Sequence, residues 1–221
     1  MRSRILFGIC CISVLVGQPS FTARTISTSA DNARSVSATD LDSDGDMDLL
    51  SASSDDDKIA WYENNGSQSF TARTISTDFD GAWSVYAIDV DSDGDMDVLS
   101  ASHNDDKIAW YENTTAAPGT PTFTAADIAT SADGAKAAFA ADMDNDGDLD
   151  IVSASINDQT VAWYENDGAA NPSWTAANIS TSAGGVNSVF VADMDNDGDL
   201  DIVSSATDNN DGIAWYENNG A

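Results

Sequence analysis

The 221 residues are enough for one sizeable domain. With 38 acidic and 8 basic residues, the chain has a formal net charge of −30, which excludes nucleic-acid binding through phosphate neutralisation. A hydrophobic content of 42% and six tryptophans exclude the composition of a disordered acidic chain and indicate a packed core. Such a charge suits cations, basic partners or a saline medium.

Residues 1–17 differ from the rest in composition and predict a secretory signal peptide. Arg2 and Arg4 precede an apolar run from Ile5 to Val16, which is too short to span a bilayer comfortably. No A-x-A-like cleavage pair occurs near Gly17. The alternative is a misassigned start codon or a truncated gene with a hydrophobic beginning. We expect a secreted, extracellular protein.

Both cysteines, Cys10 and Cys11, lie in this apolar run. Once the run is removed, the mature domain (18–221) has no cysteine for a disulfide, a nucleophile or a metal site. No segment of this domain is apolar over a length that would cross a membrane.

The domain is built from four copies of one unit. "FTARTIST" begins at Phe21 and recurs unchanged at Phe70, with related copies at Phe123 and Trp174. "WYEN" begins at Trp61, Trp110, Trp163 and Trp215. The period of about 50 residues is typical of a repeat architecture.

Four short strands are predicted in each unit. In the second copy they are "FTARTIS" (70–76), "WSVYAIDV" (83–90), "DVLSAS" (97–102) and "KIAWYEN" (107–113), all rich in β-branched and aromatic residues. We predict an all-β β-propeller of four four-stranded blades. The chain opens with the first of these strands and stops before its next copy. The opening strand could therefore complete the last blade and close a four-blade ring; the alternative is part of a larger propeller.

An acidic loop of nine residues joins the second and third of these strands in every unit: 40–48, 89–97, 142–150 and 193–201. In the first copy, "DLDSDGDMD", the carboxylates at positions 1, 3 and 5 can converge if the chain turns sharply at Gly45. Asp46 at position 7 can offer its backbone carbonyl, and Asp48 at position 9 closes the cage. The sequence thus predicts about four Ca²⁺ sites, with a solvated acidic turn as the alternative.

The loop is not an EF-hand, because position 12 is a serine rather than a bidentate glutamate, and its flanks are predicted strands. An all-oxygen ligand set disfavours zinc, and magnesium would prefer more water and a stricter octahedron.

The pattern D-x-D-x-D-G-x-x-D between two strands, in units ending "IAWYEN", resembles the FG-GAP/VCBS repeats over residues 18–221. Such repeats build the calcium-binding propellers of integrin α-subunits and of many secreted bacterial and algal proteins. The resemblance implies side-chain ligands at positions 1, 3, 5 and 9: Asp40, Asp42, Asp44, Asp48, Asp89, Asp91, Asp93, Asp97, Asp142, Asp144, Asp146, Asp150, Asp193, Asp195, Asp197 and Asp201. The position-7 residues complete the predicted metal set: Asp46, Asp95, Asp148 and Asp199.

Two features depart from the family. Its propellers usually have seven blades, whereas this chain has four units, and the literal "FG…GAP" residues are absent.

We expect calcium to be mainly structural and the protein to be a non-catalytic binding or adhesion module. The alternative is a secreted polysaccharide-active enzyme, a lyase or hydrolase, or its propeller module. His103 is the only histidine, and no nucleophile–base–orienter set is visible. The "WYEN" tryptophans could stack on sugars, but one per strand favours packing between blades.

The face opposite the calcium loops is the predicted ligand face, for a protein or a carbohydrate. Arg34, Trp83, Lys136 and Asn187 hold equivalent places there and differ from one another. Neutral drift on a solvated surface is the alternative. The oligomeric state stays open.

Export is directly testable. Sequencing the N-terminus of secreted protein should give a residue beyond Cys11. Secreted material that begins at Met1 or Cys10 would contradict the signal-peptide prediction.

Overall fold

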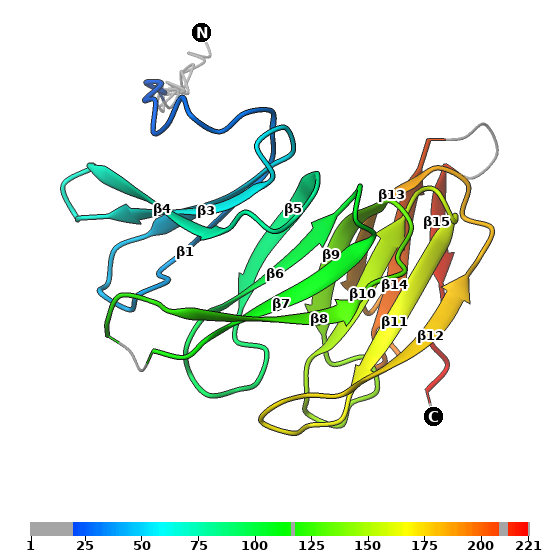
Figure 1. Cartoon of the computed structure of the whole chain (residues 1–221). Coiled ribbons are helices and arrows are strands. Elements are labelled where there is room, and N and C mark those ends of the chain that lie inside the picture. The colour runs from blue at the N-terminus through cyan, green and yellow to red at the C-terminus, as the bar shows by residue number, and fades with distance from the viewer. Residues whose placement is uncertain (1–19, 116–117, 208–211, 221) are drawn as a thin grey trace, which may run out of the picture.

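The computed structural model describes residues 20–115, 118–207 and 212–220, which form four antiparallel β-sheets and no helix (Figure 1). The all-β prediction and the organisation in four units are confirmed. In these residues no helix could cross a membrane. The predicted signal peptide (1–17), with Cys10 and Cys11, lies outside the described residues.

Each sheet is one blade, and its strands follow one another in sequence order. The first blade has β1 (Ala33–Thr39), β2 (Asp48–Ser53), β3 (Lys58–Asn64) and β4 (Phe70–Ser76). The second has β5 (Ala82–Ile88), β6 (Asp97–Ser102), β7 (Lys107–Asn113) and β8 (Phe123–Ala129). The third has β9 (Ala135–Ala141), β10 (Asp150–Ser155), β11 (Thr160–Asn166) and β12 (Trp174–Ser180). The fourth has β13 (Val186–Ala192), β14 (Asp201–Ala206) and β15 (Ile213–Tyr216).

The first strand of each blade lies innermost, beside the first strand of the next blade. β1 packs against β5, β5 against β9 and β9 against β13. Aromatic rings continue this contact: Tyr86 stacks on Phe139 at a centroid distance of 5.8 Å, and Phe139 meets Phe190 at 5.2 Å. The outer strand β4 is largely exposed. This radial order is the arrangement of propeller blades.

Apolar cores fill the spaces between successive blades. Leu50 and Trp61 of the first blade pack with Val85 of the second, in one continuous cluster of buried residues. Trp61 and Trp110 are each only 1% exposed. Their burial confirms that these tryptophans are packing residues, and it removes them as sugar platforms.

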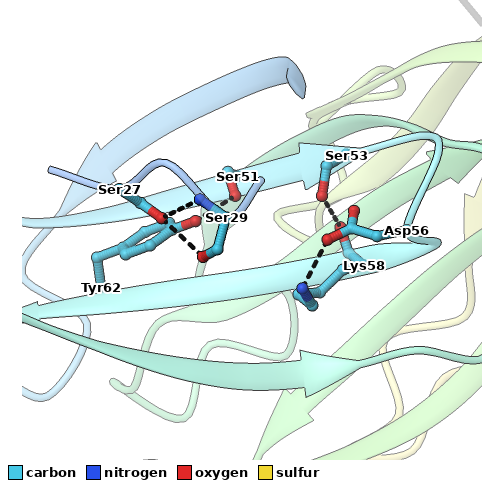
Figure 2. A network of polar contacts seen from close by, with 7 residues as sticks. All are labelled: Ser27, Ser29, Ser51, Ser53, Asp56, Lys58 and Tyr62. Carbon is cyan, nitrogen blue, oxygen red and sulfur yellow. Dashed lines mark hydrogen bonds and ion pairs between the residues drawn. The ribbon is translucent and has the colours of Figure 1, made fainter. Parts of the chain in front are cut away.

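Two serines of β2 make side-chain hydrogen bonds within the first blade. The hydroxyl of Ser51 donates to the hydroxyl of Tyr62 at 3.3 Å, and that of Ser53 donates to the carbonyl of Lys58 at 3.4 Å. Lys58 itself pairs with Asp56 at 2.6 Å (Figure 2). Hydrogen bonds of this kind allow small polar residues in a strand that is covered on both faces.

The fourth blade has three strands, and the strand predicted at "FTARTIS" (21–27) is not formed. The identical sequence at 70–76 forms β4 because β3 lies beside it and pairs with it. Residues 21–27 instead lie near the first blade, while β15 is at the other end of the array (Figure 1). The described structure therefore does not contain the ring closure that the opening strand would have made.

Among the described residues no fourth strand pairs with β15, and a hollow of about 340 Å³ lies beside this blade, lined partly by Trp163, Ile202 and Tyr216. In the two preceding gaps, Phe123 and Trp174 from the outer strands β8 and β12 pack against the corresponding cores. The edge strand β15 is correspondingly open.

Equivalent tryptophans should therefore differ in their contribution to stability. Trp110→Ala should lower the free energy of unfolding by about 3–5 kcal/mol, or the melting temperature by about 6–20 °C. Trp215 is 48% exposed, so Trp215→Ala should lower the free energy of unfolding by about 1 kcal/mol or less. Melting both variants with the wild type in the same calcium buffer tests the ranking. Equal losses would contradict it.

Candidate metal sites

The acidic loops join the first and second strands of every blade, which are the second and third strands of the predicted unit. A glycine allows each loop to turn sharply. The glycine at position 6 has φ of +97° in Gly45 and +100° to +102° in its three equivalents. This region is open to glycine and strained for other residues. Position 4 is also left-handed, with φ of +57° to +64°, at Ser43, Ser92, Asn145 and Asn196. The sharp turn predicted at position 6 is confirmed.

The first aspartate folds each loop around its own carboxylate. In the first blade, Asp40 Oδ1 accepts the N–H of Asp44 at 3.1 Å, and Asp40 Oδ2 accepts the N–H of Gly45 at 3.0 Å. Asp89 and Asp142 make the same pair of bonds in the next two blades. The donors are backbone groups, so the loop turns its N–H groups inward to the acidic side chains.

The ninth aspartate is buried and ties the loop to the blade. Asp97 is fully buried; its Oδ2 accepts the N–H of Val90 at 3.0 Å, and its Oδ1 accepts the N–H of Asn113 at 2.7 Å. The first donor is in the loop, and the second ends β7. The same two bonds recur at Asp48, Asp150 and Asp201.

Every loop brings three carboxylate oxygens to within 4.8 Å of one another. The groups are Asp40, Asp42 and Asp48; Asp89, Asp91 and Asp97; Asp142, Asp144 and Asp146; and Asp193, Asp195 and Asp197. Positions 1 and 3 thus meet in all four blades. Position 9 joins them in the first two blades and position 5 in the last two.

The carboxylates at position 7 are not in these groups. In three blades they lie against the turn that follows "WYEN": a Cβ on Gly66 would clash with Asp46 Oδ2, and Gly168 and Gly220 have the same relation to Asp148 and Asp199. Sequence reasoning did not foresee this side-chain position. The backbone carbonyl of position 7 as a calcium ligand stays a prediction.

Burial and like charge act together on the clustered carboxyls. Desolvation, and then the neighbouring carboxylates, raise the pKa of Asp42 and Asp91. Desolvation raises the pKa of Asp97 to about 7, against the opposing effect of its backbone hydrogen bonds. Both effects disfavour the ionised form, and a divalent cation at the cluster would offset both.

The donor set fits a hard cation. It consists of carboxylate oxygens, with neither sulfur nor imidazole among the clustered residues. Ca²⁺ takes six to eight such oxygens in flexible geometry, with carbonyls and water completing the shell.

The chain matches the family model of the FG-GAP-like repeat three times, over residues 40–100, 89–153 and 142–204. These matches together cover well over half of its length. The chain belongs to the FG-GAP-like repeat family.

Two solved structures share the fold of this FG-GAP-like repeat chain. One is a lectin of Agrocybe aegerita, described for specific recognition of non-reducing terminal N-acetylglucosamine, at 20% identity and a TM-score of 0.53. The other is the rhamnogalacturonan lyase YesW, at 14% identity and a TM-score of 0.52. The alignments cover 86% and 79% of this chain but only 50% and 41% of those proteins. A search of curated proteins gave no match.

The asparagine of "WYEN" is a site residue that sequence reasoning missed. Asn64 donates its side-chain amide to the carbonyl of Met47 at 3.0 Å, while its backbone N–H binds Asp48. Asn113 and Asn166 repeat the arrangement. The signal was its fixed place in every repeat. This asparagine holds the end of the third strand against the end of the acidic loop.

The loops of the opposite face join neighbouring repeats by hydrogen bonds. Asp57 Oδ1 accepts the N–H of Gly81 at 2.9 Å, and Asp106 Oδ1 accepts the N–H of Gly134 at 2.9 Å. Both bonds cross from one blade to the next. They account for two acidic residues that lie outside the acidic loops.

Two aspartates of one loop should separate metal binding from fold. Asp97→Ala leaves two backbone N–H groups without an acceptor, so it should lower the free energy of unfolding by about 2–6 kcal/mol even at low calcium. Asp91→Ala removes a clustered carboxylate and should reduce mainly the calcium-dependent part of the stability. Melting curves over a calcium titration, from the lowest concentration at which the wild type folds, measure both parts. An Asp97→Ala variant as stable as the wild type at that concentration would contradict the structural role.

Proposed function

We propose that this chain is an exported β-propeller, stabilised by calcium at its acidic loops, that acts as a non-catalytic module for binding carbohydrate. The observation that carries the proposal is the recurrence of one carboxylate cluster in all four blades. A fixed site in every structural unit is expected of a metal that stabilises the scaffold.

The physical reason for a structural metal is the cost of the loops without it. Each nine-residue run holds five carboxylates and no basic residue. Two like charges about 4 Å apart repel by roughly 4 kcal/mol at an effective dielectric of 20. Calcium replaces this repulsion with direct oxygen ligation and fixes the two strands that flank the loop. Residues 18–221 contain no cysteine, so no disulfide within them could do this.

Carbohydrate is the favoured ligand class because the two similar structures described above belong to proteins that bind or cleave carbohydrate according to their names. One recognises terminal N-acetylglucosamine, and the other is a lyase of a polysaccharide. Adhesion to a glycan-bearing surface is the biological setting that we infer.

The non-catalytic part of the proposal rests on the surroundings of the acidic residues. The aspartates at positions 1, 3, 5 and 9 of the acidic loops are the proposed calcium ligands. Asp57 and Asp106 are acceptors in bonds between blades. Incubation with neutral and acidic polysaccharides should therefore release neither reducing ends nor unsaturated products. Release of either would instead favour the polysaccharide-active enzyme.

Removing calcium should lower the melting temperature strongly or unfold the protein. A ligand that binds only the folded state stabilises it by RT ln(1 + [L]/Kd). For a Kd of about 10⁻⁴–10⁻³ M and about 10 mM calcium, each site gives roughly 1.4–2.7 kcal/mol, and four give roughly 5–11 kcal/mol. This is comparable to the whole stability of a typical domain.

Thermal melting with excess chelator, and after calcium or magnesium is added back, measures the effect. Magnesium at equal concentration should restore much less, because it demands a stricter geometry. A melting curve that chelator leaves unmoved, in protein shown to be metal-free, would reject the calcium proposal.

A further inference from the structure

Two cations and one tryptophan converge on the face opposite the metal loops. The guanidinium carbon of Arg34 lies 4.2 Å from the centroid of the Trp83 ring, and the ammonium nitrogen of Lys136 lies 4.0 Å from the same centroid. They belong to β1, β5 and β9, so the cations reach the ring from the strands on either side. The imidazole of His103 lies 5.5 Å from the ring. Trp83, Lys136 and His103 are partly exposed and Arg34 is exposed.

Arg34, Trp83 and Lys136 each lie at a β-bulge. In every blade, the register of the first strand skips one residue against the second strand, and the skipped residues are Arg34, Trp83, Lys136 and Asn187. A bulge leaves one residue out of the ladder and redirects its side chain. Each of the four blades thus has one bulged residue at the same place in its first strand, and this residue differs from blade to blade.

The cations in this cluster have no acidic partner. Among the described residues, Lys58, Arg73 and Lys107 each form an ion pair with a nearby carboxylate, whereas Arg34 and Lys136 do not. Arg34 has a hydroxyl acceptor instead, Ser54 Oγ at 3.0 Å. Burial, and then the charge of Arg34, lower the pKa of Lys136, as expected of two cations held near each other. Two cations without an ion pair thus lie close to one indole in a chain of net charge −30.

The surrounding acidic residues limit which anion would fit. Asp55, Asp80 and Asp133 are on the loops of the same face, each accepting a hydrogen bond from a neighbouring asparagine: Asn32 at 2.8 Å, Asn104 at 2.7 Å and Asn157 at 2.9 Å. These carboxylates would repel a dense polyanion. One isolated anionic group beside the ring would meet the two cations, while the part of the Trp83 side chain that stays exposed offers an apolar surface against which a sugar ring can pack.

We propose that Arg34, Trp83 and Lys136 form a binding site for a saccharide that carries one isolated anionic group, a hexuronate carboxylate or a single sulfate ester. This inference rests on the proposed carbohydrate-binding function and specifies its site and substrate class. Arg34 and Lys136 bind the anion, and Trp83 binds the sugar ring. The simpler reading, in which the two cations only cover the indole, predicts no preference for charge.

Calorimetric titration of the calcium-loaded protein tests the site with oligosaccharides of equal length. The probes are a neutral oligosaccharide, one with a single hexuronate unit, one with a single sulfate ester, and a polyuronate. The singly charged probes should bind at least about tenfold more tightly than the neutral one, with affinity falling as salt rises. The carboxylate and sulfate probes distinguish the two sources of the charge.

Arg34→Gln and Lys136→Met should each weaken binding of the charged probe about tenfold, and Trp83→Ala should weaken binding of every probe. Their melting temperatures should stay within a few degrees of the wild type. Arg73→Gln is the matched control, since Arg73 is already paired with Glu63, and it should leave the affinity unchanged.

The two proposals fail differently. If neutral and charged probes bind alike and the Arg34 and Lys136 variants match the wild type, this site is overturned and the carbohydrate-binding function stands. If the folded, calcium-loaded protein binds no oligosaccharide, the proposed carbohydrate-binding function is overturned, and this inference with it. Tighter binding of the polyuronate than of the singly charged probe would overturn the restriction to an isolated anion.

Discussion

The structure depends on one buried carboxylate per blade, the ninth residue of the acidic loop. Asp97 accepts one N–H from its own loop and one from the end of β7, so three strands of the blade meet at its two oxygens. Its burial makes the charge costly, and the same group lies within the cluster that fits a cation. In the first two blades, the side chain that holds the blade together is therefore also one of the clustered carboxylates that could bind a cation.

The two faces of the blades differ in how strictly their sequences repeat. On the face that carries the acidic loops, the loops repeat nearly residue for residue, and the left-handed glycine and the bonds of the ninth aspartate recur in all four blades. On the opposite face the interblade bonds from Asp57 and Asp106 fix the loops, while the bulged residue has no place in the ladder. The fold thus leaves that residue free to differ in each blade at little structural cost.

The sequence predicted the features that local chemistry determines, and it missed those that depend on a distant partner. The repeats, the strands of three complete blades and the glycine turns follow from patterns within about 50 residues. "FTARTIS" is identical at 21–27 and 70–76, yet only the second copy has a strand beside it and forms a ladder. The bulges could not be predicted from the sequence either. Strand alternation assigns successive residues to opposite faces of a sheet, and only the observed register shows which residue is left unpaired.

Variation at the bulges would not by itself indicate a ligand, because a residue outside the ladder can drift. The arrangement of the side chains is the stronger argument. Holding Arg34 and Lys136 near one indole brings two like charges together and desolvates one of them, although the chain is rich in carboxylates that could pair with either. Drift on a solvated acidic surface would favour such pairing, as Lys58, Arg73 and Lys107 illustrate. A cost of this kind is expected where binding an anion later compensates it.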